Sequence, residues 1–384
     1  MFFLRMVLRN AFRHRLRTAL TIAGLAVAVL AYGLLQTVVG AWYAGADAAS
    51  NARLITRNSI SLVFPLPLSY HARIRSIEGV TEVAYSNWFG GIYREPKNFF
   101  PQFAVSANYL NLYPEFVLDA EQLLMWQRDR RGALVGRQLA EQFDFKVGDM
   151  LPLRGTIYPG TWEFVIRGIF DGSDETRITR QMLFHWDYLN EFVRKARPRG
   201  GNMVGVYISG IVNPADAAVL SREIDAMFRN SLAETMTETE QAFQLGFVAM
   251  SDQIIAAIRI VSYVVILIIL AVMANTMAMS ARERTAEYAT LKALGFGPRF
   301  LVLLIFGESI AICAIGGGLG LALTWPAAEG FGQAADGIFP VFQVSTQTAA
   351  WQAGCALAVG VLAAIVPAAT AARVHIVDGL RAIA

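Results

Sequence analysis

Residues 260–299 read IVSYVVILIILAVMANTMAMSARERTAEYATLKALGFGPR, and this stretch decides the fold. The part from Ile260 to Ala281 has no charged residue and is long enough for a helix that crosses about 30 Å of hydrocarbon. The charged part that follows has good helix formers and ends at Gly295, with Pro298 just beyond. We therefore expect a membrane-spanning helix followed by a short polar helix.

Three further runs are uncharged or nearly so: Thr18 to Ala46, Phe300 to Ala328 with Glu308 as its one charge, and Gly337 to Ala372. Any one of these runs could be a buried core helix of a soluble protein. However, only 16% of the chain is charged, against about 25% in soluble domains. Four such runs together favour a membrane protein. We place the four spans at residues 18–42, 254–281, 300–324 and 348–372.

Basic residues near the ends of the spans predict the orientation, because cytoplasmic loops carry an excess of Lys and Arg. They gather in the N-terminal tail, in the segment after the second span and in the C-terminal tail, 373–384, whereas the loop 325–347 has none. Both termini are therefore expected in the cytoplasm of a bacterium, with the spans in the inner membrane and residues 43–250 outside. The N-terminal apolar segment is too long for a cleavable signal peptide. The basic residues used are Arg5, Arg9, Arg13, Arg15, Arg17, Arg282, Arg284, Lys292, Arg299, Arg373 and Arg381.

The segment 43–250 predicts a large α/β domain in the periplasm. Trp162, Phe164 and Ile166 alternate as in a half-buried strand. Asn213-Pro214 is typical of a helix start, with a capping residue followed by proline in the first turn. Strands and helices mix along the segment, so we expect two lobes, with a core and an insertion at about 100–200.

Sequence motifs for chemistry are missing. The chain contains no HExxH, CxxC or GxSxG, and no GxxxxGK[ST] that would hold a nucleotide phosphate. The carboxylates Asp171, Asp174 and Glu175 fit a solvated loop better than a metal site. The net charge of +3 is too small to indicate nucleic acid. We expect no catalytic, cofactor or metal site and therefore no enzyme activity in this chain alone.

Two polar segments flank the spans. Residues 1–17 predict an amphipathic elbow helix whose arginines face anionic headgroups, or a simple stop-transfer flank. Residues 282–297 predict a helix suited to docking a soluble partner, or an inert interfacial turn. Within the third span, Glu308 is either functional or a carboxyl protonated or hydrogen-bonded between helices. Small residues four apart allow close helix packing: Gly24 with Ala28, Ala274 with Ala278, and Gly316 with Gly320.

Several motifs, in this order and topology, resemble the permease subunits of ABC transporters of the MacB and FtsX type, also called type VII permeases. The resemblance covers essentially the whole chain, although the macrolide exporters of this type carry a fused N-terminal nucleotide-binding domain that this sequence lacks. The C-terminal signature also usually has a proline near Ile376. The similar segments are Leu16–Thr21, Ala133–Gly136, Val147–Asp149, Glu283–Gly295, Gly316–Gly320, Pro367–Arg373 and Asp378–Arg381.

The resemblance implies a permease that works with a second permease protomer and a separately encoded ABC ATPase, which binds the ATP and magnesium. Such permeases transmit motion to a periplasmic domain and export or extract an amphiphilic molecule or a lipoprotein, in some cases with a periplasmic adaptor and an outer-membrane partner. The alternative is a regulator of a periplasmic cell-wall hydrolase, as in FtsX. The residues implied in coupling to the ATPase are Arg282, Glu283, Arg284, Glu287, Leu291, Lys292, Leu294 and Gly295.

Overall fold

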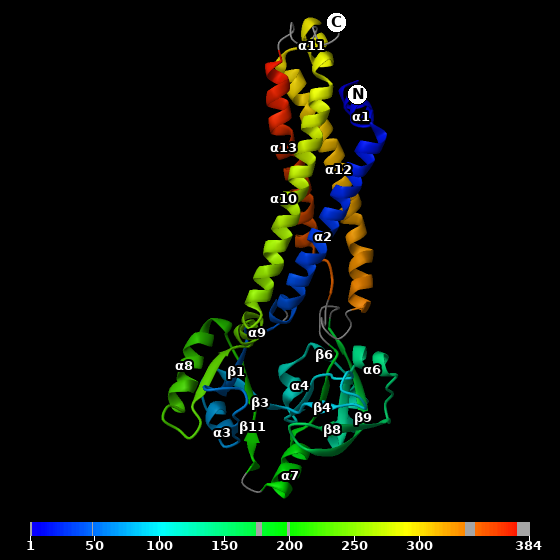
Figure 1. Cartoon of the computed structure of the whole chain (residues 1–384). Coiled ribbons are helices and arrows are strands. Elements are labelled where there is room, and N and C mark those ends of the chain that lie inside the picture. Colours follow the sequence, from blue (N-terminus) through cyan, green and yellow to red (C-terminus); the bar gives the residue numbers. More distant parts are fainter. Residues whose placement is uncertain (1, 48, 174–178, 198–199, 335–341, 375–384) are drawn as a thin grey trace. The chain divides into compact units, whose positions relative to one another are not determined.

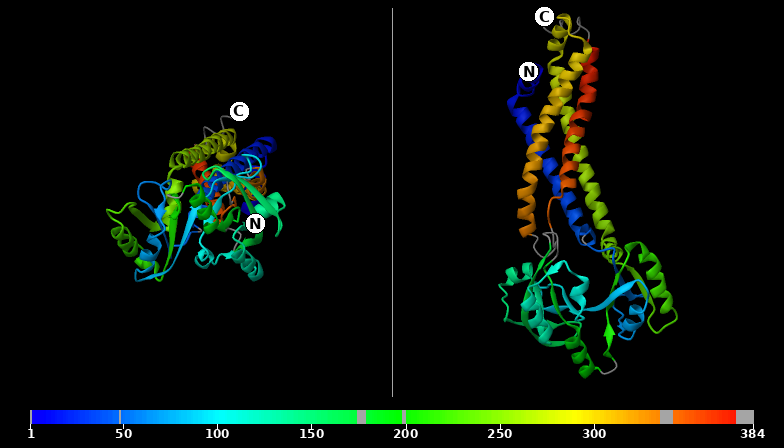
Figure 2. Two further views of the ribbon diagram at one scale, coloured as in Figure 1. Left: turned by 90° about the horizontal axis from the view of Figure 1, so that it is seen from below. Right: turned by 180° about the vertical axis from the view of Figure 1, so that it is seen from behind.

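Four helices are long and apolar enough to cross a membrane, among the residues that the computed structural model describes: 2–47, 49–173, 179–197, 200–334 and 342–374. They are α2 (Arg15–Asp47), α10 (Asp252–Glu283), α12 (Pro298–Ala334) and α13 (Thr346–Arg373). They run alongside one another (Figures 1 and 2). The predicted membrane fold, with four spans and a large α/β domain after the first, is confirmed.

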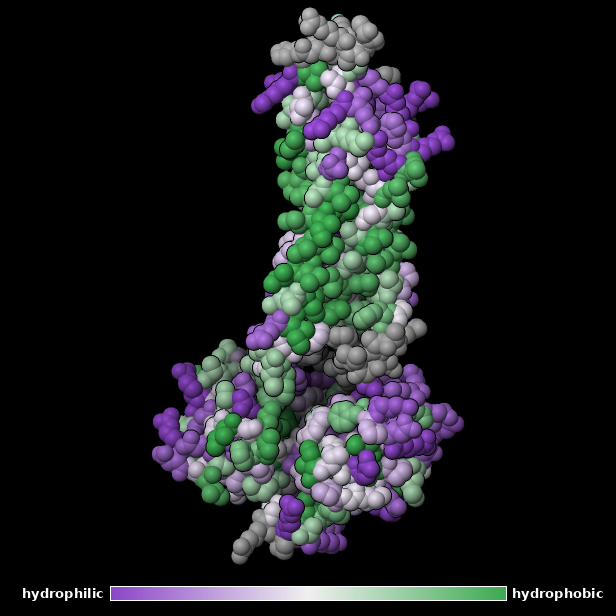
Figure 3. Space-filling view, in the orientation of Figure 1, coloured by the Kyte–Doolittle hydropathy of each residue, from purple (hydrophilic) through white to green (hydrophobic). Residues whose placement is uncertain are grey.

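The chain divides into two compact units. The helical unit is Met1–Trp42 with Ser251–Ala384, and the sheet unit is Tyr43–Met250. In the helical unit, apolar atoms cover the long helices and hydrophilic atoms gather at the end where α1 and α11 lie (Figure 3). This polar end contains the segments that the sequence singled out.

Several helix ends differ from the sequence predictions. The elbow helix 1–17 is shorter, because α1 (Phe2–Ala11) ends before a turn and α2 begins at Arg15. The polar helix α11 (Thr285–Ala293) is likewise shorter than 282–297. The largest difference lies in the predicted loop 325–347, whose first ten residues continue α12 as far as Ala334. Pro326 lies inside this helix, and a proline is tolerated in a membrane helix when neighbouring groups satisfy the freed carbonyl.

The sheet unit is built on one mixed sheet that has eleven strands among the described residues. Along the sheet the order is β13-β1-β12-β3-β5-β10-β7-β9-β8-β4, and β6 pairs with β9. Pairing is antiparallel except for β5 with β10 and β7 with β9. The strands in sheet order are β13 (Thr235–Thr239), β1 (Arg53–Asn58), β12 (Val206–Ile211), β3 (Val80–Trp88), β5 (Gln102–Val105), β10 (Met182–His185), β7 (Gly132–Gly136), β9 (Gly160–Gly172), β8 (Met150–Gly155) and β4 (Gly91–Ile92), with β6 (Phe116–Val117) beside β9.

The sheet has two halves in sequence. Strands β13, β1, β12 and β3, here the core half, come from before residue 90 and after residue 205, and the others, the inserted half, come from residues 91–185. The predicted insertion at about 100–200 therefore continues the same sheet. A small pair, β2 (Leu66–Pro67) with β11 (Met203–Val204), lies apart from it. The helices of the unit are α3 (Tyr70–Arg75), α4 (Tyr109–Leu112), α5 (Ala120–Arg128), α6 (Arg137–Phe143), α7 (Trp186–Ala196), α8 (Ala217–Met227) and α9 (Glu240–Ala249).

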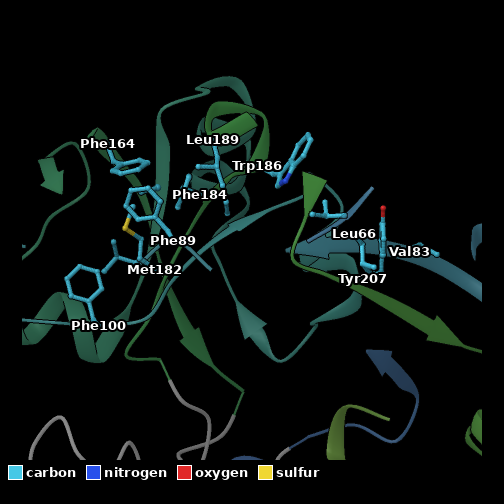
Figure 4. Packing of buried hydrophobic residues seen from close by; sticks show 14 of the residues in the cluster. Leu66, Val83, Phe89, Phe100, Phe164, Met182, Phe184, Trp186, Leu189 and Tyr207 are labelled. Carbon is cyan, nitrogen blue, oxygen red and sulfur yellow. The ribbon is translucent and has the colours of Figure 1, made fainter. Parts of the chain in front are cut away.

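Buried aromatic residues form the core of the sheet unit. The predicted alternation of Trp162, Phe164 and Ile166 is confirmed in β9, where all three are buried and the residues between them are not. The Phe89 ring lies 5.1 Å from the Trp162 ring and 5.2 Å from the Phe184 ring, centroid to centroid. Figure 4 shows Phe89 and Phe184 packed together, with Trp186 between them and the core-half residues Val83 and Tyr207. Burying such a side chain contributes about 1.5–3 kcal/mol.

Candidate functional site: the polar helix between the second and third spans

Helix α11 is bounded by sharp changes of chain direction. Arg284 separates it from α10, and Gly295 ends it with a φ of +94°. The N–H of Phe296 donates to the carbonyl of Leu291, and the N–H of Gly295 donates to the carbonyl of Lys292. This pair of bonds is the Schellman motif, which needs a left-handed residue at the glycine position. The chain thus forms a short, firmly ended helix between two long ones.

A buried ion pair fastens the start of α11 to α12. The Nη1 of Arg284 donates to both carboxylate oxygens of Glu308, at 2.6 and 2.9 Å, and the two side chains are 7% and 5% exposed. The guanidinium also lies 5.3 Å from the ring of Tyr288. Of the two alternatives for Glu308, the structure therefore favours a carboxylate held between helices. Its partner Arg284 could not be named from the sequence alone.

Two further ion pairs connect α10 and α11 to the N-terminal segment. Glu287 accepts hydrogen bonds from Arg13 and from Arg284, and Arg17 donates to both oxygens of Glu283 at 2.8 Å. Arg13 and Arg17 of the predicted elbow therefore have glutamate partners within the chain, and the contact of the elbow with headgroups stays a prediction. A signal for this pairing was available, since Arg13 and Arg17, like Glu283 and Glu287, are four residues apart in segments that the sequence predicts to be helical. In the structure each pair spans a turn between two helices.

The end of α11 is attached to α13. The Nζ of Lys292 donates to the carbonyls of Ala372 and Val374, at 2.8 and 2.7 Å. These carbonyls belong to the last turn of α13 and the residue after it, where helix carbonyls have no partner within the helix. A lysine at a helix C-terminus also complements the helix dipole. The structure therefore brings Glu283, Arg284, Glu287 and Lys292 together as internal contacts of the helical unit.

The remaining predicted coupling residues separate into inner and outer ones. Leu291 is half-buried and packs against the core of the helical unit, and its predicted role in coupling to a partner stays a prediction. Leu294 is 72% exposed, and Phe296 beside it is 41% exposed. Arg282 and Gly295 are exposed as well. The exposed apolar residues of this segment, Leu294 and Phe296, thus lie just after the end of α11.

The charges change the acid–base properties of this end. Burial would raise the pKa of Glu287, but the hydrogen bonds from Arg13 and Arg284 outweigh it and lower the pKa below the ordinary value. Burial raises the pKa of Tyr288 to about 12, against a lowering by the charge of Arg284. Burial would lower the pKa of Arg284, but the negative charge of Glu308 and the hydrogen bonds to Glu308 and Glu287 outweigh it and raise the pKa. Glu287 and Arg284 are therefore both ionised at neutral pH.

A small polar cavity of about 30 Å³ lies beside the ion pair of Arg284 and Glu308. Glu308 is in its wall, together with hydroxyl groups of α2 and α10. A space of this size and polarity has room for ordered water, which could solvate a buried carboxylate. The other polar lining residues are Asn10, His14, Arg17, Thr18, Thr21, Thr276 and Ser280.

The small residues predicted for helix packing have different roles. A Cβ added at Gly320 would lie 2.5 Å from the carbonyl oxygen of Ala26, and one at Gly316 would lie 3.0 Å from that of Ile22, so α12 packs directly on α2 there. At Gly24 the nearest atom would be 4.0 Å away. Ala28, Ala274 and Ala278 are half-buried, and the buried positions of α10 next to Ala274 and Ala278 are instead Met273, Met277 and Ala281.

One polar contact between spans lies outside the sequence predictions, which considered ionisable groups only. Gln352 on α13 is fully buried. Its amide donates to the carbonyl of Val29 on α2 at 2.9 Å and to the hydroxyl of Thr324 on α12 at 2.8 Å. Three spans therefore meet at one side chain.

The carboxylates predicted to lie in a solvated loop belong to the sheet unit. Asp171 accepts two hydrogen bonds from Arg137, whereas Asp174 and Glu175 lie outside the described residues.

Comparisons with known proteins agree with this architecture. Residues 259–376, which run from α10 into the tail after α13, match the family described as FtsX-like permease C-terminal. The macrolide export ATP-binding/permease protein MacB of Shewanella sp. (strain ANA-3) is 30% identical over 47% of this chain and 28% of its own length. MacB of Escherichia coli is 34% identical over 28% of this chain and 16% of its own length. The chain thus spans less than a third of either relative.

Two solved structures resemble the chain with low scores. The periplasmic region of MacB from Actinobacillus actinomycetemcomitans is 8% identical with a TM-score of 0.38, covering 52% of this chain and 94% of that one. The extracellular domain of the transporter YknZ from Gram-positive bacteria is 9% identical with a TM-score of 0.37, covering 49% and 98%. On the FtsX-like match across the last three long helices and the MacB relatives, this multi-pass membrane protein has an FtsX-like permease region and is similar to ABC transporter permeases of the MacB type.

Proposed function

We propose that the chain transmits the motion of a separate ATPase to its sheet unit. The observation that supports this most is the attachment of α11. Arg284, just before α11, forms an ion pair with Glu308 on α12, and Glu287 of α11 forms one with the N-terminal segment. Lys292 near the end of α11 donates hydrogen bonds to backbone carbonyls at the end of α13. Since α10 precedes α11 directly in the chain, a push on α11 would reach most of the helical unit. A flexible loop at this place would absorb such a push.

The proposal places α11 and both termini in the cytoplasm and the sheet unit in the periplasm of a bacterium, following the distribution of Lys and Arg. ATP and magnesium bind to the ATPase partner, and this chain binds neither. A second permease protomer completes the transporter. A periplasmic adaptor and an outer-membrane partner accompany it where the cargo crosses the envelope.

The proposed cargo is an amphiphilic molecule or a lipoprotein, taken from the membrane or periplasm. The relatives are named for macrolide export, and macrolides are amphiphilic. A polar path through the spans would call for several ionisable groups, whereas Glu308 is the one charge between Phe300 and Ala328, and it is paired. We therefore infer that the cargo does not pass between the spans and that the sheet unit moves it.

The test uses Leu294→Asp, which places a carboxylate on the exposed end of α11. Leu16→Asp is the matched control, because Leu16 is 76% exposed and lies outside α11. Tagged chains are isolated in mild detergent from native membranes, and co-purified ATPase and ATP turnover are measured. We expect Leu294→Asp to lose both and the control to keep both, since a buried carboxylate without a partner is costly.

If Leu294→Asp recruits the ATPase normally, the exposed end of α11 is not part of the docking surface. A wall hydrolase co-purifying in place of transport components would support the regulator alternative instead. Thermal melting of each variant shows whether folding is unchanged.

A further inference from the structure

The sheet unit holds a buried cluster of charges, here the Arg53 cluster, made of Arg53, Glu115 and Glu240. The Nε of Arg53 donates to Glu240 at 2.6 Å, and its Nη2 donates to Glu115 at 2.6 Å. Its Nη1 donates to the carbonyl of Leu112 at 2.8 Å, and the guanidinium stacks 4.2 Å above the Tyr113 ring. All three charged residues are less than 10% exposed.

The three residues come from the places where the chain enters and leaves the sheet unit. Arg53 is the first residue of β1, six residues after α2 ends at Asp47. Glu240 is the first residue of α9, which ends at Ala249, three residues before α10 begins. Glu115 follows α4 and precedes β6, so it belongs to the inserted half. Arg53 therefore links three parts of the sheet unit: the segment that follows α2, the helix α9 that precedes α10, and the inserted half.

Contacts continue from Glu115 into the inserted half. The N–H of Ser173, just after β9, donates to the carbonyl of Glu115 at 2.8 Å. The neighbouring residue Phe116 pairs with Gly172 in β6 and β9, and its ring lies 5.0 Å from the Phe170 ring. A displacement of Arg53 would thus be passed to the long strand β9.

Stability alone is a poor explanation for the Arg53 cluster. Burying an arginine and two carboxylates carries a large desolvation cost, and well-packed apolar residues often stabilise such a site as well or better. The second carboxylate, Glu240, is compensated by the N–H of Ser50, by the hydroxyl of Tyr113 and by its position at the start of α9, where the helix dipole favours a negative charge. Unlike apolar packing, these directional hydrogen bonds fix the positions of β1, α9 and Glu115 relative to one another.

We propose that Arg53, Glu115 and Glu240 form a mechanical joint, with Arg53 as the positioning residue, that makes the two halves of the sheet follow the spans as one body. This inference rests on the proposed transmission function and specifies where the motion enters the sheet unit. Without the joint, β1 and α9 still follow α2 and α10, but the inserted half follows β1 less closely, through the pairing of β12, β3 and β5 and the side-chain core alone.

The test measures distances between spin labels in the complex of the full-length chain with its ATPase, with and without a non-hydrolysable ATP analogue. Labels at Glu78→Cys and Glu141→Cys report the separation of the two halves, and labels at Gly40→Cys and Gln253→Cys report the outer ends of α2 and α10. All four positions are exposed. The native residues Cys313 and Cys355 are replaced by alanine.

The test variant is Arg53→Met with Glu115→Gln and Glu240→Gln, which leaves no buried charge behind. The matched control is Arg167→Met with Asp129→Asn, because this partly buried ion pair lies within the inserted half. In wild type and control, the nucleotide should change the distance between the spans and leave that between the halves unchanged. In the test variant the distance between the halves should shift on adding nucleotide, while the melting temperature stays near that of wild type.

Each of the other outcomes contradicts the joint, and one of them contradicts the transmission function as well. An unchanged distance between the halves in the test variant refutes the joint and leaves the proposed function standing. A distribution broadened equally with and without nucleotide means a structural role only. No change between the spans in wild type refutes the transmission function, and the joint with it. If the triple variant does not fold, Arg53→Lys, which keeps the charge but lacks the planar fork, is measured in its place and decides by the same criteria.

Discussion

Arg284 is the residue that most determines how α11 is held. It is buried, and its charge is matched by Glu308 on α12 and by Glu287 one turn further along. A buried charge without a partner is far less stable than a buried pair. The position of α11 therefore depends on both members of the pair being present.

We predict that Glu308→Ala destabilises the chain by about 3–5 kcal/mol, because it leaves the Arg284 charge buried and uncompensated. The double variant Arg284→Met/Glu308→Leu should be close to wild type in stability, since packed apolar residues can replace a buried pair. Equilibrium unfolding in mixed micelles measures both. A double variant as unstable as the single one would show that the pair itself, rather than the avoidance of a lone charge, holds the helices.

The partner of Glu308 shows what the sequence could and could not predict at this scale. A carboxylate within an apolar run is conspicuous, so Glu308 was found. Its partner lies 24 residues away at the junction of two helices, and any of several basic residues in the same segment had the reach. Only the turn between α10 and α11 directs Arg284, rather than Arg282, into the bundle, and that turn has no strong sequence signal.

Glu287 should make stability depend on pH. Its pKa in the fold is lower than its ordinary value of 4.5, so its ionised form is the one that folding favours. Its contribution is present above that ordinary value and is lost as the pH falls through the lower pKa of the folded state. We predict that Glu287→Gln flattens the fall in melting temperature below about pH 4.5 relative to wild type. Identical pH profiles of melting temperature would contradict this prediction.

Among the elements, α12 depends on glycine for its contact with α2. Gly316 and Gly320 face α2, whereas a Cβ added at Gly318, between them, would meet no atom within 4 Å. The spacing of four was visible in the sequence and indicates close packing. Which helix would be the partner was not visible, because Gly24, Ala28, Ala274 and Ala278 offered similar small surfaces on two helices.

The glycines of α12 allow a test in which two similar substitutions act in opposite directions. Gly320→Ala should destabilise the chain by about 1–3 kcal/mol, because its Cβ would press on the backbone of α2. Gly318→Ala should stabilise it by up to about 1 kcal/mol, from the higher helix propensity of alanine. Thermal melting of the two purified variants is the measurement. Equal effects at both positions would mean that α12 does not pack on α2 through Gly320.

The length of α12 was harder to predict than its existence. The run from Phe300 is plainly apolar, and the span predicted from it ends at residue 324, just before Trp325-Pro326. A proline disfavours the helical conformation in the residue before it. The helix nevertheless continues to Ala334. Alanines at positions 327 and 328 favour the helix again after the proline, and one missing hydrogen bond did not end it.

At the scale of the whole molecule, the sequence determined the number of spans and the class of the sheet unit because both rest on patterns of many residues. Long uncharged runs and strict alternation, as in Trp162 to Ile166, are strong signals. Contacts between distant segments were not predictable in the same way. Arg53, Glu115 and Glu240 are far apart in the chain and unremarkable in sequence, and only the order of strands in the sheet brings them together.

The topology of the whole chain is the prediction on which the proposed function depends. It rests on arginines and lysines gathered in the N-terminal tail, the segment of α11 and the C-terminal tail, against none in residues 325–347. We therefore expect Ser173→Cys, in the sheet unit, to react with a membrane-impermeant maleimide in intact spheroplasts, and Thr290→Cys, on α11, to react only after lysis. Both residues are exposed, and Cys313 and Cys355 are replaced by alanine so that each variant has one thiol. Labelling of Thr290→Cys in intact cells, with protection of Ser173→Cys, would reverse the orientation. An ATPase in the cytoplasm could then not reach α11, and the transmission of motion from α11 to the sheet unit would have to be abandoned.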